Sequence, residues 1–156
     1  MTNSAEVLNS FLVDAFDEIL KTEELALSGD LSLREIHLIV AVCRAVDQER
    51  DNRATAIAAA QGVTAGTLTT SVTSLERRGY LERRRDEQDK RAVRIYPTGK
   101  GREAERRHAA FHREMVSGVL DILDEGETLS LVRALAGITN FFRRKQHDTK
   151  EQGAEV

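Results

Sequence analysis

Residues 53–101 read RATAIAAAQGVTAGTLTTSVTSLERRGYLERRRDEQDKRAVRIYPTGKG, and this stretch decides the fold. Its alanine-rich beginning, residues 53–61, favours a short helix that stops at Gly62. Thr64 is a typical N-cap for a second, longer helix that ends at Gly79. The apolar face of that helix consists of Leu68, Val72 and Leu75. A short helix, a glycine turn and a longer helix predict a helix-turn-helix.

Two short extended segments follow, at residues 80–85 and 92–96. The polar run 86–91 separates them, and this pattern predicts a β-hairpin. Pro97 ends the second strand because proline has no N–H group to donate to a ladder. A helix-turn-helix with a hairpin behind it is a winged helix-turn-helix. The sequence therefore predicts a DNA-binding lobe of the kind used by transcriptional regulators.

The charge distribution supports a nucleic-acid partner, although the whole chain carries a net charge of −3. Residues 77–113 hold 13 Arg or Lys against 6 Asp or Glu, a local charge of +7. Residues 1–76 carry −7 and residues 114–156 carry −3. One basic region in an acidic chain is expected when a single surface meets phosphates.

Helices are expected on both sides of this lobe. Apolar residues recur at helical spacing over residues 4–24, and Ser32 with Glu35 forms a capping box for a helix that reaches about Val46. On the other side, Thr98 caps a helix that continues to about Leu123.

A last helix is expected over residues 125–145, and the polar tail 146–156 is expected to be frayed and flexible. With a single proline in 156 residues, the predicted fold class is mainly α. The flanking helices are amphipathic and hold more apolar surface than one chain can bury. We expect one domain, 1–156, with a winged lobe at 32–97 and the helices of a homodimer interface at 1–30 and 98–145.

The second helix of the helix-turn-helix is rich in hydroxyl side chains. β-Branched threonine has a modest helix propensity, so an ordinary exposed helix would favour Lys and Glu. Short hydroxylated side chains allow close approach to a major groove, bond to phosphates and bases, and offer methyl groups to thymine. We therefore expect DNA contacts from Thr64, Thr67, Thr69, Thr70 and Thr73.

The predicted wing is rich in basic residues. An arginine at the tip of a hairpin can enter the flanking minor groove, where narrow A/T-rich sequence deepens the negative potential. We expect Arg91 to take this role, with further DNA contacts from Arg84 and Lys90. Asp86 and Asp89 are expected to brace the turn through bonds to backbone amides and a pair with Arg91.

The wing motif resembles a known family. The segment DEQDKR (86–91), followed by TGKG (98–101), resembles the wing signature of the MarR family: two aspartates, an arginine, then a threonine and a glycine that open the next helix. With the helices on both sides, the resemblance covers about residues 4–145. It implies a homodimer with two winged lobes, pseudo-palindromic operators, and control by a ligand near the junction of the lobe and the dimerisation helices.

Four shorter segments are similar to the FabT group within this family, repressors of fatty-acid synthesis genes. They are GTLTTSV (66–72), LERRGY (75–80), EQD (87–89) and RHAAFH (107–112). The similarity implies that the corepressor is a long-chain acyl group on acyl carrier protein, with the acidic carrier against basic residues near the junction. The acyl chain would lie between the first, second and fifth helices, lined by Phe11, Phe16, Ile36 and Phe111; His37, His108 and His112 lie in the same ligand-binding region.

The histidines allow an alternative. His108 and His112 are four residues apart, so both imidazoles lie on one helix face, a usual metal-ligand geometry. His37 lies where zinc-sensing MarR relatives, which this chain also resembles, carry a ligand, and Glu23 or Glu24 could supply a carboxylate. Such a pair is also common as plain helix surface or as a hydrogen-bonded junction, and FabT-like proteins carry a similar pair. We expect no cofactor or metal; the alternative is a regulator that responds to zinc, through His37, His108, His112 and Glu24, or to a small aromatic ligand.

Other classes of function have little support in the sequence. There is no glycine-rich phosphate loop and no nucleophile elbow, so we predict that the protein is not an enzyme. The longest apolar run, residues 38–43, is too short to span a membrane, and no signal segment opens the chain. The lone Cys43 lies in that apolar run, so we expect it to be buried in a cytoplasmic protein.

Overall fold

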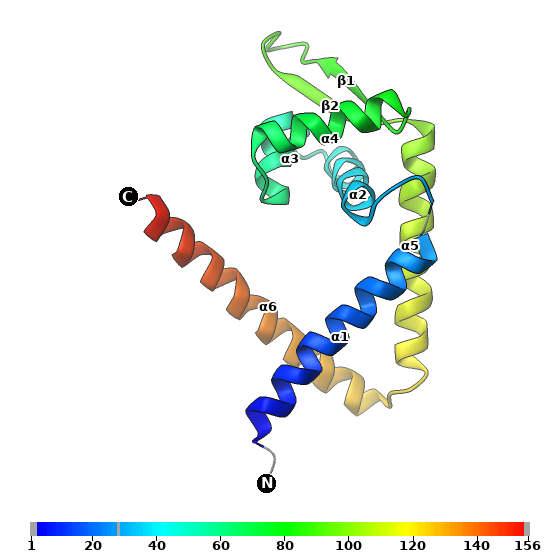
Figure 1. Ribbon diagram of the computed structural model, residues 1–156, viewed down its shortest axis with the longest axis vertical. Coiled ribbons are helices and arrows are strands. Elements are labelled where there is room, and N and C mark those ends of the chain that lie inside the picture. Colours follow the sequence, from blue (N-terminus) through cyan, green and yellow to red (C-terminus); the bar gives the residue numbers. More distant parts are fainter. Residues whose placement is uncertain (1–2, 28, 155–156) are drawn as a thin grey trace. The chain divides into compact units, whose positions relative to one another are not determined.

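Six helices and one two-stranded sheet make up the described part of the chain, residues 3–27 and 29–154 of a computed structural model (Figure 1). In chain order they are α1 (Ser4–Leu27), α2 (Leu33–Asp47), α3 (Ala54–Gln61), α4 (Ala65–Arg77), β1 (Leu81–Arg85), β2 (Val93–Pro97), α5 (Gly99–Leu120) and α6 (Glu125–Ala154). This order confirms the mainly α fold class and the winged helix-turn-helix, in which α3 and α4 precede the β1–β2 wing.

Two compact units divide the chain, one ending at His112 and one beginning at Arg113. The first unit holds α1 to β2 and the first part of α5. Its core is a cluster in which Ile39, Leu75 and Ile95 are fully buried, so α2, α4 and β2 meet at one apolar centre. Each such side chain contributes about 1.5–3 kcal/mol to folding. Cys43 is buried in the same cluster, as predicted, and burial raises the pKa of its thiol to about 11.

Local signals set the helix ends in the first unit. The Ser32 hydroxyl accepts from the backbone N–H of Glu35 at 3.3 Å, and the Glu35 carboxylate accepts from the Ser32 N–H at 2.8 Å, which confirms the capping box. Gly62 closes α3 with φ of 64°, a left-handed conformation that favours glycine and makes the tight turn into α4. Thr64 caps α4 by accepting from the Thr67 N–H at 3.2 Å.

The wing is tied to the connection between α2 and α3. The strands pair antiparallel, from Leu81 opposite Pro97 to Arg85 opposite Val93. The buried Asn52 donates from its side chain to the Ile95 carbonyl at 2.9 Å, and the Ile95 N–H donates back to the Asn52 carbonyl at 3.0 Å. Asn52, which is far from the hairpin in sequence, therefore extends the hydrogen bonding of the sheet on the outer side of β2.

The second unit holds the end of α5 and the helix α6. Apolar side chains of α6 are exposed to between 46% and 60%: Leu129, Val132, Leu135 and Phe142. The exposed row repeats at helical spacing, which leaves an uncovered apolar face on this helix. Among the described helices, none combines the length and the apolar character that crossing a membrane requires.

Three predicted helix ends were wrong. Helix α6 continues to Ala154 instead of ending near Lys145, so residues 146–154 are helical; residues 155–156 lie outside the described chain. The reason is that residues 143–152 contain mainly good helix formers and no proline or glycine. In the same way α1 continues to Leu27 rather than Glu24, while α5 ends at Leu120 rather than Leu123.

Substitution of Gly101 by alanine should destabilise the first unit. Gly101 is buried where α5 begins, and a Cβ there would collide with the backbone carbonyl of Tyr80, which cannot move without shifting the wing. We expect Gly101→Ala to lower the free energy of unfolding by about 1–3 kcal/mol in urea denaturation. Gly99→Ala is the control because a Cβ at Gly99 meets nothing within 4 Å. Equal stability of the two variants would show that this close approach is not constraining.

Candidate functional site

The exposed face of α4 carries the threonines predicted to contact DNA. Leu68, Val72 and Leu75 are buried beneath the helix. The five predicted residues are all exposed: Thr64, Thr67, Thr69, Thr70 and Thr73. Arg77, in the last turn, is exposed as well, and sequence reasoning did not include it. The helix thus has a buried apolar side and a hydroxyl-rich outer side, as a groove-reading helix requires.

The wing tip is organised around the buried carboxylate of Asp86. Its Oδ1 accepts from the backbone N–H groups of Gln88 at 2.8 Å and Asp89 at 3.1 Å, while Arg94 pairs with Oδ2. These two backbone donors, together with Arg94, hold the pKa of Asp86 below its ordinary value. Arg94 also donates to the Asn52 side chain at 2.8 Å, so the tip is linked to the base of the wing.

The predicted pairing of the aspartates with Arg91 was wrong in part. Both aspartates do bind backbone amides, since Asp89 accepts from the Arg91 N–H at 3.0 Å. The guanidinium that pairs with Asp86 belongs to Arg94, because the strand register brings Arg94 beside Asp86 and leaves Arg91 at the tip. Among the described residues, no ion pair involves the exposed Arg91 side chain, so its charge is free for a partner.

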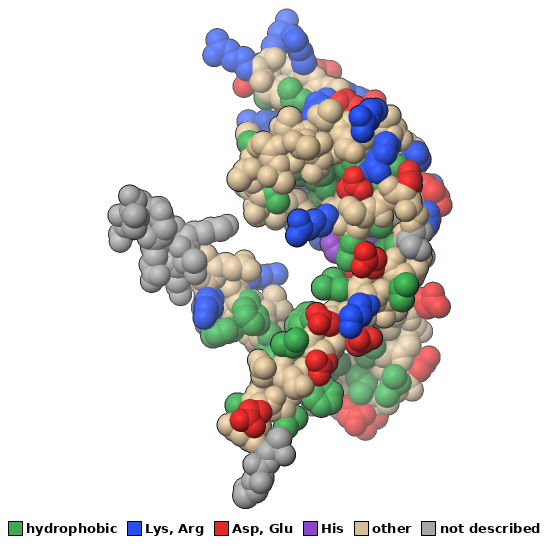
Figure 2. Space-filling model, viewed as in Figure 1, with side chains coloured by type: hydrophobic (Ala, Val, Ile, Leu, Met, Phe, Trp, Pro, Cys, Tyr) green, Lys and Arg blue, Asp and Glu red, His purple; other side chains and the backbone are tan. Residues whose placement is uncertain are grey.

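The other basic side chains of the wing differ in whether they interact with groups of the protein. Figure 2 shows Lys and Arg side chains gathered at the end of the first unit that carries the hairpin in Figure 1. Lys90 is exposed at the tip. Arg84 is exposed, pairs with Glu82 and lies 4.7 Å from the centre of the Tyr96 ring. Arg83 instead turns back toward α4, where it pairs with Glu76.

A second cluster in the first unit brings three histidines to one carboxylate. Glu23 of α1 is only 2% exposed, and its Oε1 lies 3.0 Å from Nε2 of His37 on α2. The same oxygen lies 2.8 Å from Nε2 of His108 and 3.4 Å from Nε2 of His112, both on α5. The two α5 nitrogens are 3.1 Å apart. Side chains from α1, α2 and α5 therefore converge on a single point.

The electrostatics of this cluster are those of a buried anion among imidazoles. Burial raises the pKa of Glu23, but the hydrogen bond with His37 and the neighbouring histidines outweigh it, so the pKa lies below its ordinary value. Burial lowers the pKa of His108, and His112 adds to this effect. The Glu23 carboxylate is thus held in its ionised form at neutral pH.

The sequence left the carboxylate of this cluster open between Glu23 and Glu24, and the structure places Glu23 there. Glu24, which was named in the zinc alternative, is exposed, and its neighbour Glu23 points at the histidines. One residue along a helix is a rotation of about 100°, so the choice depends on how α1 turns toward α2 and α5. The predicted convergence of His37, His108 and His112 themselves is observed.

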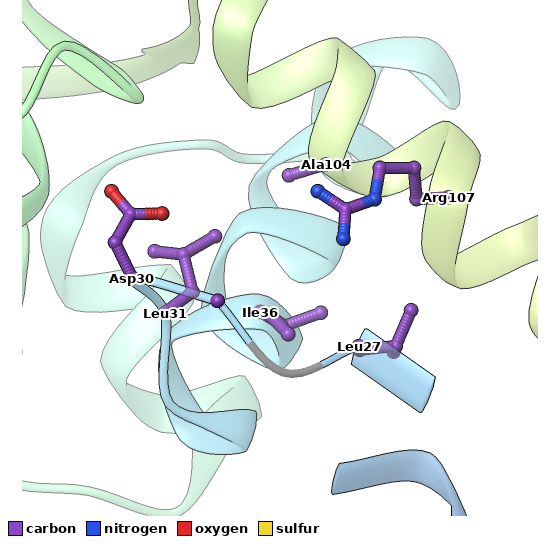
Figure 3. A pocket seen from close by; sticks show the side chains of 7 residues that line it. Leu27, Asp30, Leu31, Ile36, Ala104 and Arg107 are labelled. Atoms are coloured by element: carbon purple, nitrogen blue, oxygen red, sulfur yellow. The ribbon is translucent and has the colours of Figure 1, made fainter. Parts of the chain in front are cut away.

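A small cavity lies close to this cluster, where α1, α2 and α5 meet. Its volume is about 20 Å³, and it is lined by Leu27, Gly29, Asp30, Leu31, Ile36, Ala104 and Arg107. In Figure 3 Arg107 extends its guanidinium toward the cavity, whereas the Asp30 carboxylate points away from it. Asp30 is held there by the Tyr80 hydroxyl, which donates to it at 2.6 Å. The cavity has room for about one water molecule.

The predicted lining of a ligand site is only partly assembled. Ile36 lines the cavity, and Phe111 is half-buried next to His112, with ring centres 5.4 Å apart. Phe11 and Phe16 do not line it; they are 70% and 55% exposed on α1. Of the four apolar residues that the sequence interpretation had grouped, Ile36 alone lines this cavity.

Comparison with known proteins is decisive for the family. FabT from Streptococcus pneumoniae, solved in complex with DNA, is 34% identical over 90% of this chain and 99% of its own, with a TM-score of 0.84. A model of the MarR family also matches residues 41–93.

The chain belongs to the MarR family.

Further structures share the MarR fold at lower identity. A mutant of MepR from S. aureus has 19% identity over 90% of this chain and 99% of its own, with a TM-score of 0.71. A MepR–DNA complex has 21% identity over 86% and 97%, with a TM-score of 0.68. No curated protein matches the sequence significantly. Membership of the MarR family confirms that the chain is a DNA-binding transcription regulator and not an enzyme.

Removal of the Asp86 carboxylate should loosen the wing tip of this MarR protein. Asp86→Ala leaves two backbone amides and Arg94 without their acceptor. We expect trypsin to cleave after Lys90 and Arg91 about tenfold faster, because the local opening free energy falls. Glu87→Ala, at an exposed neighbouring position, is the control. Unchanged cleavage in Asp86→Ala would mean that the turn holds its shape without this carboxylate.

Proposed function

We propose that the protein is a homodimeric repressor that reads a pseudo-palindromic operator with α4 in the major groove and Arg91 in the flanking minor groove. The observation that carries this proposal is the pairing of an exposed threonine face on α4 with an unpaired arginine at a braced wing tip. Short side chains let the helix backbone approach the bases, and the arginine supplies positive charge at the wing tip.

The homodimer is supported by uncovered apolar surface. On α1, Phe11 is 70% exposed and Leu8 is 55% exposed, and α6 adds its own apolar row. Exposed apolar area of this extent, on helices at both ends of the chain, favours burial against a second copy. A symmetric dimer presents two α4 helices, so we expect half-sites about one helical turn apart. In this proposal residues 1–30 and 98–145 form the dimer interface and residues 32–97 form the DNA-binding lobe.

Arg91→Ala tests the DNA-binding mode. With a selected operator, we expect about tenfold weaker binding when the flanks are A/T-rich and little change when they are G/C-rich, since only a narrow minor groove attracts the arginine. Fluorescence anisotropy at two salt concentrations measures both effects. Arg85→Ala, at the end of β1 and away from the tip, should lower affinity alike for both flanks.

Three results would contradict this proposal. Equal losses for both flanks in Arg91→Ala would remove the minor-groove role. If the unmodified protein bound no DNA sequence specifically, the proposal that it is a regulator would be wrong. Sedimentation as a monomer at micromolar concentration, with a footprint of one half-site, would remove the dimer.

The effector that we propose is a long-chain acyl group carried on acyl carrier protein. The support is the similarity to the FabT group, together with the apolar lining of the cavity by Leu27, Leu31 and Ile36 and the cationic Arg107 at its side. The cavity of about 20 Å³ must widen to admit an acyl chain. Such widening between α1, α2 and α5 would shift the population of conformations that the DNA-binding lobe adopts.

A charge reversal tests the carrier. Acylated carrier protein should raise operator affinity about tenfold, and carrier without an acyl chain should not. Arg107→Glu should abolish the increase because it repels an acidic carrier. Arg106→Glu is the matched control, since Arg106 is exposed and pairs with Glu103 on the outer side. Equal responses of the two variants would exclude Arg107 from carrier recognition.

The histidine cluster supports a second candidate, control by a zinc ion. One ligand atom each from Glu23, His108 and His112 lies within 4.8 Å of the others, and His37 bonds to the same carboxylate. Imidazole nitrogens with one carboxylate are a donor set that suits Zn²⁺. In such a site these four residues would hold the ion and so fasten α1 to α2 and α5.

Paired substitutions at neighbouring positions test the metal. Zn²⁺ binding, measured by titration calorimetry, should weaken by roughly 100-fold in Glu23→Gln, which removes a ligand. Glu24→Gln should bind as the unmodified protein does, because Glu24 is exposed. If Zn²⁺ binds both variants equally, or does not bind the unmodified protein, the cluster is a hydrogen-bonded junction only.

A further inference from the structure

The hydroxyl groups along α4 are not equivalent, because two of them donate their proton to the helix itself. The Thr70 hydroxyl donates to the Gly66 carbonyl at 3.1 Å, and the Thr73 hydroxyl donates to the Thr69 carbonyl at 2.8 Å. A hydroxyl has one proton and two lone pairs. Both oxygens can therefore offer only lone pairs to a partner outside the helix.

Thr73 has a further partner within the protein. Nη2 of Arg83 donates to the Thr73 hydroxyl at 2.8 Å and to the Thr69 carbonyl at 3.0 Å. Arg83 is itself held by Glu76, through its Nη1 at 2.6 Å and its backbone N–H at 3.0 Å. Thr73 thus has its donor and one acceptor engaged, and it joins α4 to the first strand of the wing.

Thr70 lies where a base-reading residue belongs. It is exposed and stands two positions from both Leu68 and Val72, a rotation of about 200° from each, so it lies opposite the buried side of α4. Within the described chain, the Thr70 oxygen accepts no hydrogen bond. Its lone pairs are therefore available to a partner outside the helix.

Thr69 offers a contrast one residue away. It is exposed on the flank of α4 next to the wing, since its carbonyl accepts from Arg83. In the part of the chain that the structure describes, no hydrogen bond involves its hydroxyl. The Thr69 hydroxyl can therefore donate its proton.

We infer that Thr70 reads a base that presents an exocyclic amino group, the adenine N6 or the cytosine N4, while Thr69 donates to a phosphate and Thr73 positions the wing against α4. This inference rests on the proposed mode of DNA binding. Phosphate oxygens only accept hydrogen bonds, so an oxygen whose proton is engaged has no favourable contact with them. In the major groove the donors are the amino groups of adenine and cytosine, and these match the free lone pairs of Thr70.

Isosteric substitutions test this division of roles. Thr→Val keeps the shape, the methyl group and the β-branch but removes the hydroxyl. In selection from random duplexes, the unmodified protein should enrich adenine or cytosine at one position of each half-site, and Thr70→Val should lose that preference. Thr69→Val, the matched control, should keep the preference and bind all sequences about fivefold more weakly. Thr70→Ser, which retains the hydroxyl, should restore the preference.

A base lacking the amino group gives an independent readout. If adenine is the selected base, purine in its place should weaken binding of the unmodified protein about fivefold and leave binding of Thr70→Val unchanged; for cytosine, 2-pyrimidinone serves the same purpose. Identical base preferences in Thr70→Val and the unmodified protein would overturn the inference while leaving the proposed function intact. Selection of guanine or thymine at the affected position would overturn it as well. Failure of the unmodified protein to enrich any sequence would overturn both.

Discussion

The bond between the buried carboxylate of Asp86 and Arg94 ties the wing tip to the base of the wing. Asp86 gathers two backbone amides of the turn and the Arg94 side chain, and Arg94 reaches on to Asn52. Asn52 in turn exchanges two hydrogen bonds with Ile95, a fully buried residue of the core. The hairpin is therefore anchored to the same apolar core against which α4 packs. Because Asp86 pairs with Arg94, the guanidinium group of Arg91 at the tip remains available to a partner outside the protein.

Along α4, too, some polar groups are bonded within the protein and others remain available to a partner. Arg83, bonded to Glu76 and Thr73, connects strand β1 to α4. In the proposed mode of DNA binding, such connections lower the ordering cost, since α4 and the wing are already placed against each other before DNA binds. DNA can then contact the polar groups that have no partner within the protein. These are mainly hydroxyls on α4 and the guanidinium group at the wing tip.

Features set by neighbours in sequence could be predicted, and features set by distant neighbours could not. The Ser32–Glu35 capping box, the Gly62 turn and the Thr64 cap each depend on residues within four positions, and all were confirmed. The partner of Asp86 was predicted wrongly because hairpin register, not proximity in sequence, brings Arg94 beside it. Glu23 was not distinguished from Glu24 since one step along a helix changes the face by about 100°. The bond from Asn52 to Ile95 spans 43 positions and has no sequence signal. The exposure of the α4 threonines could be predicted because it follows directly from the apolar period of this helix.

Cys43 has a practical consequence for experiments on this protein. It is the single cysteine of the chain, it is 1% exposed, and burial keeps its thiol protonated, with a pKa of about 11. Thiol-reactive reagents attack the thiolate, so the native cysteine should be silent toward maleimides in the folded state. A cysteine introduced on the wing or on α6 would then be the single labelling point. Fluorophores or spin labels could report on the motions of either unit without first removing a residue from the core.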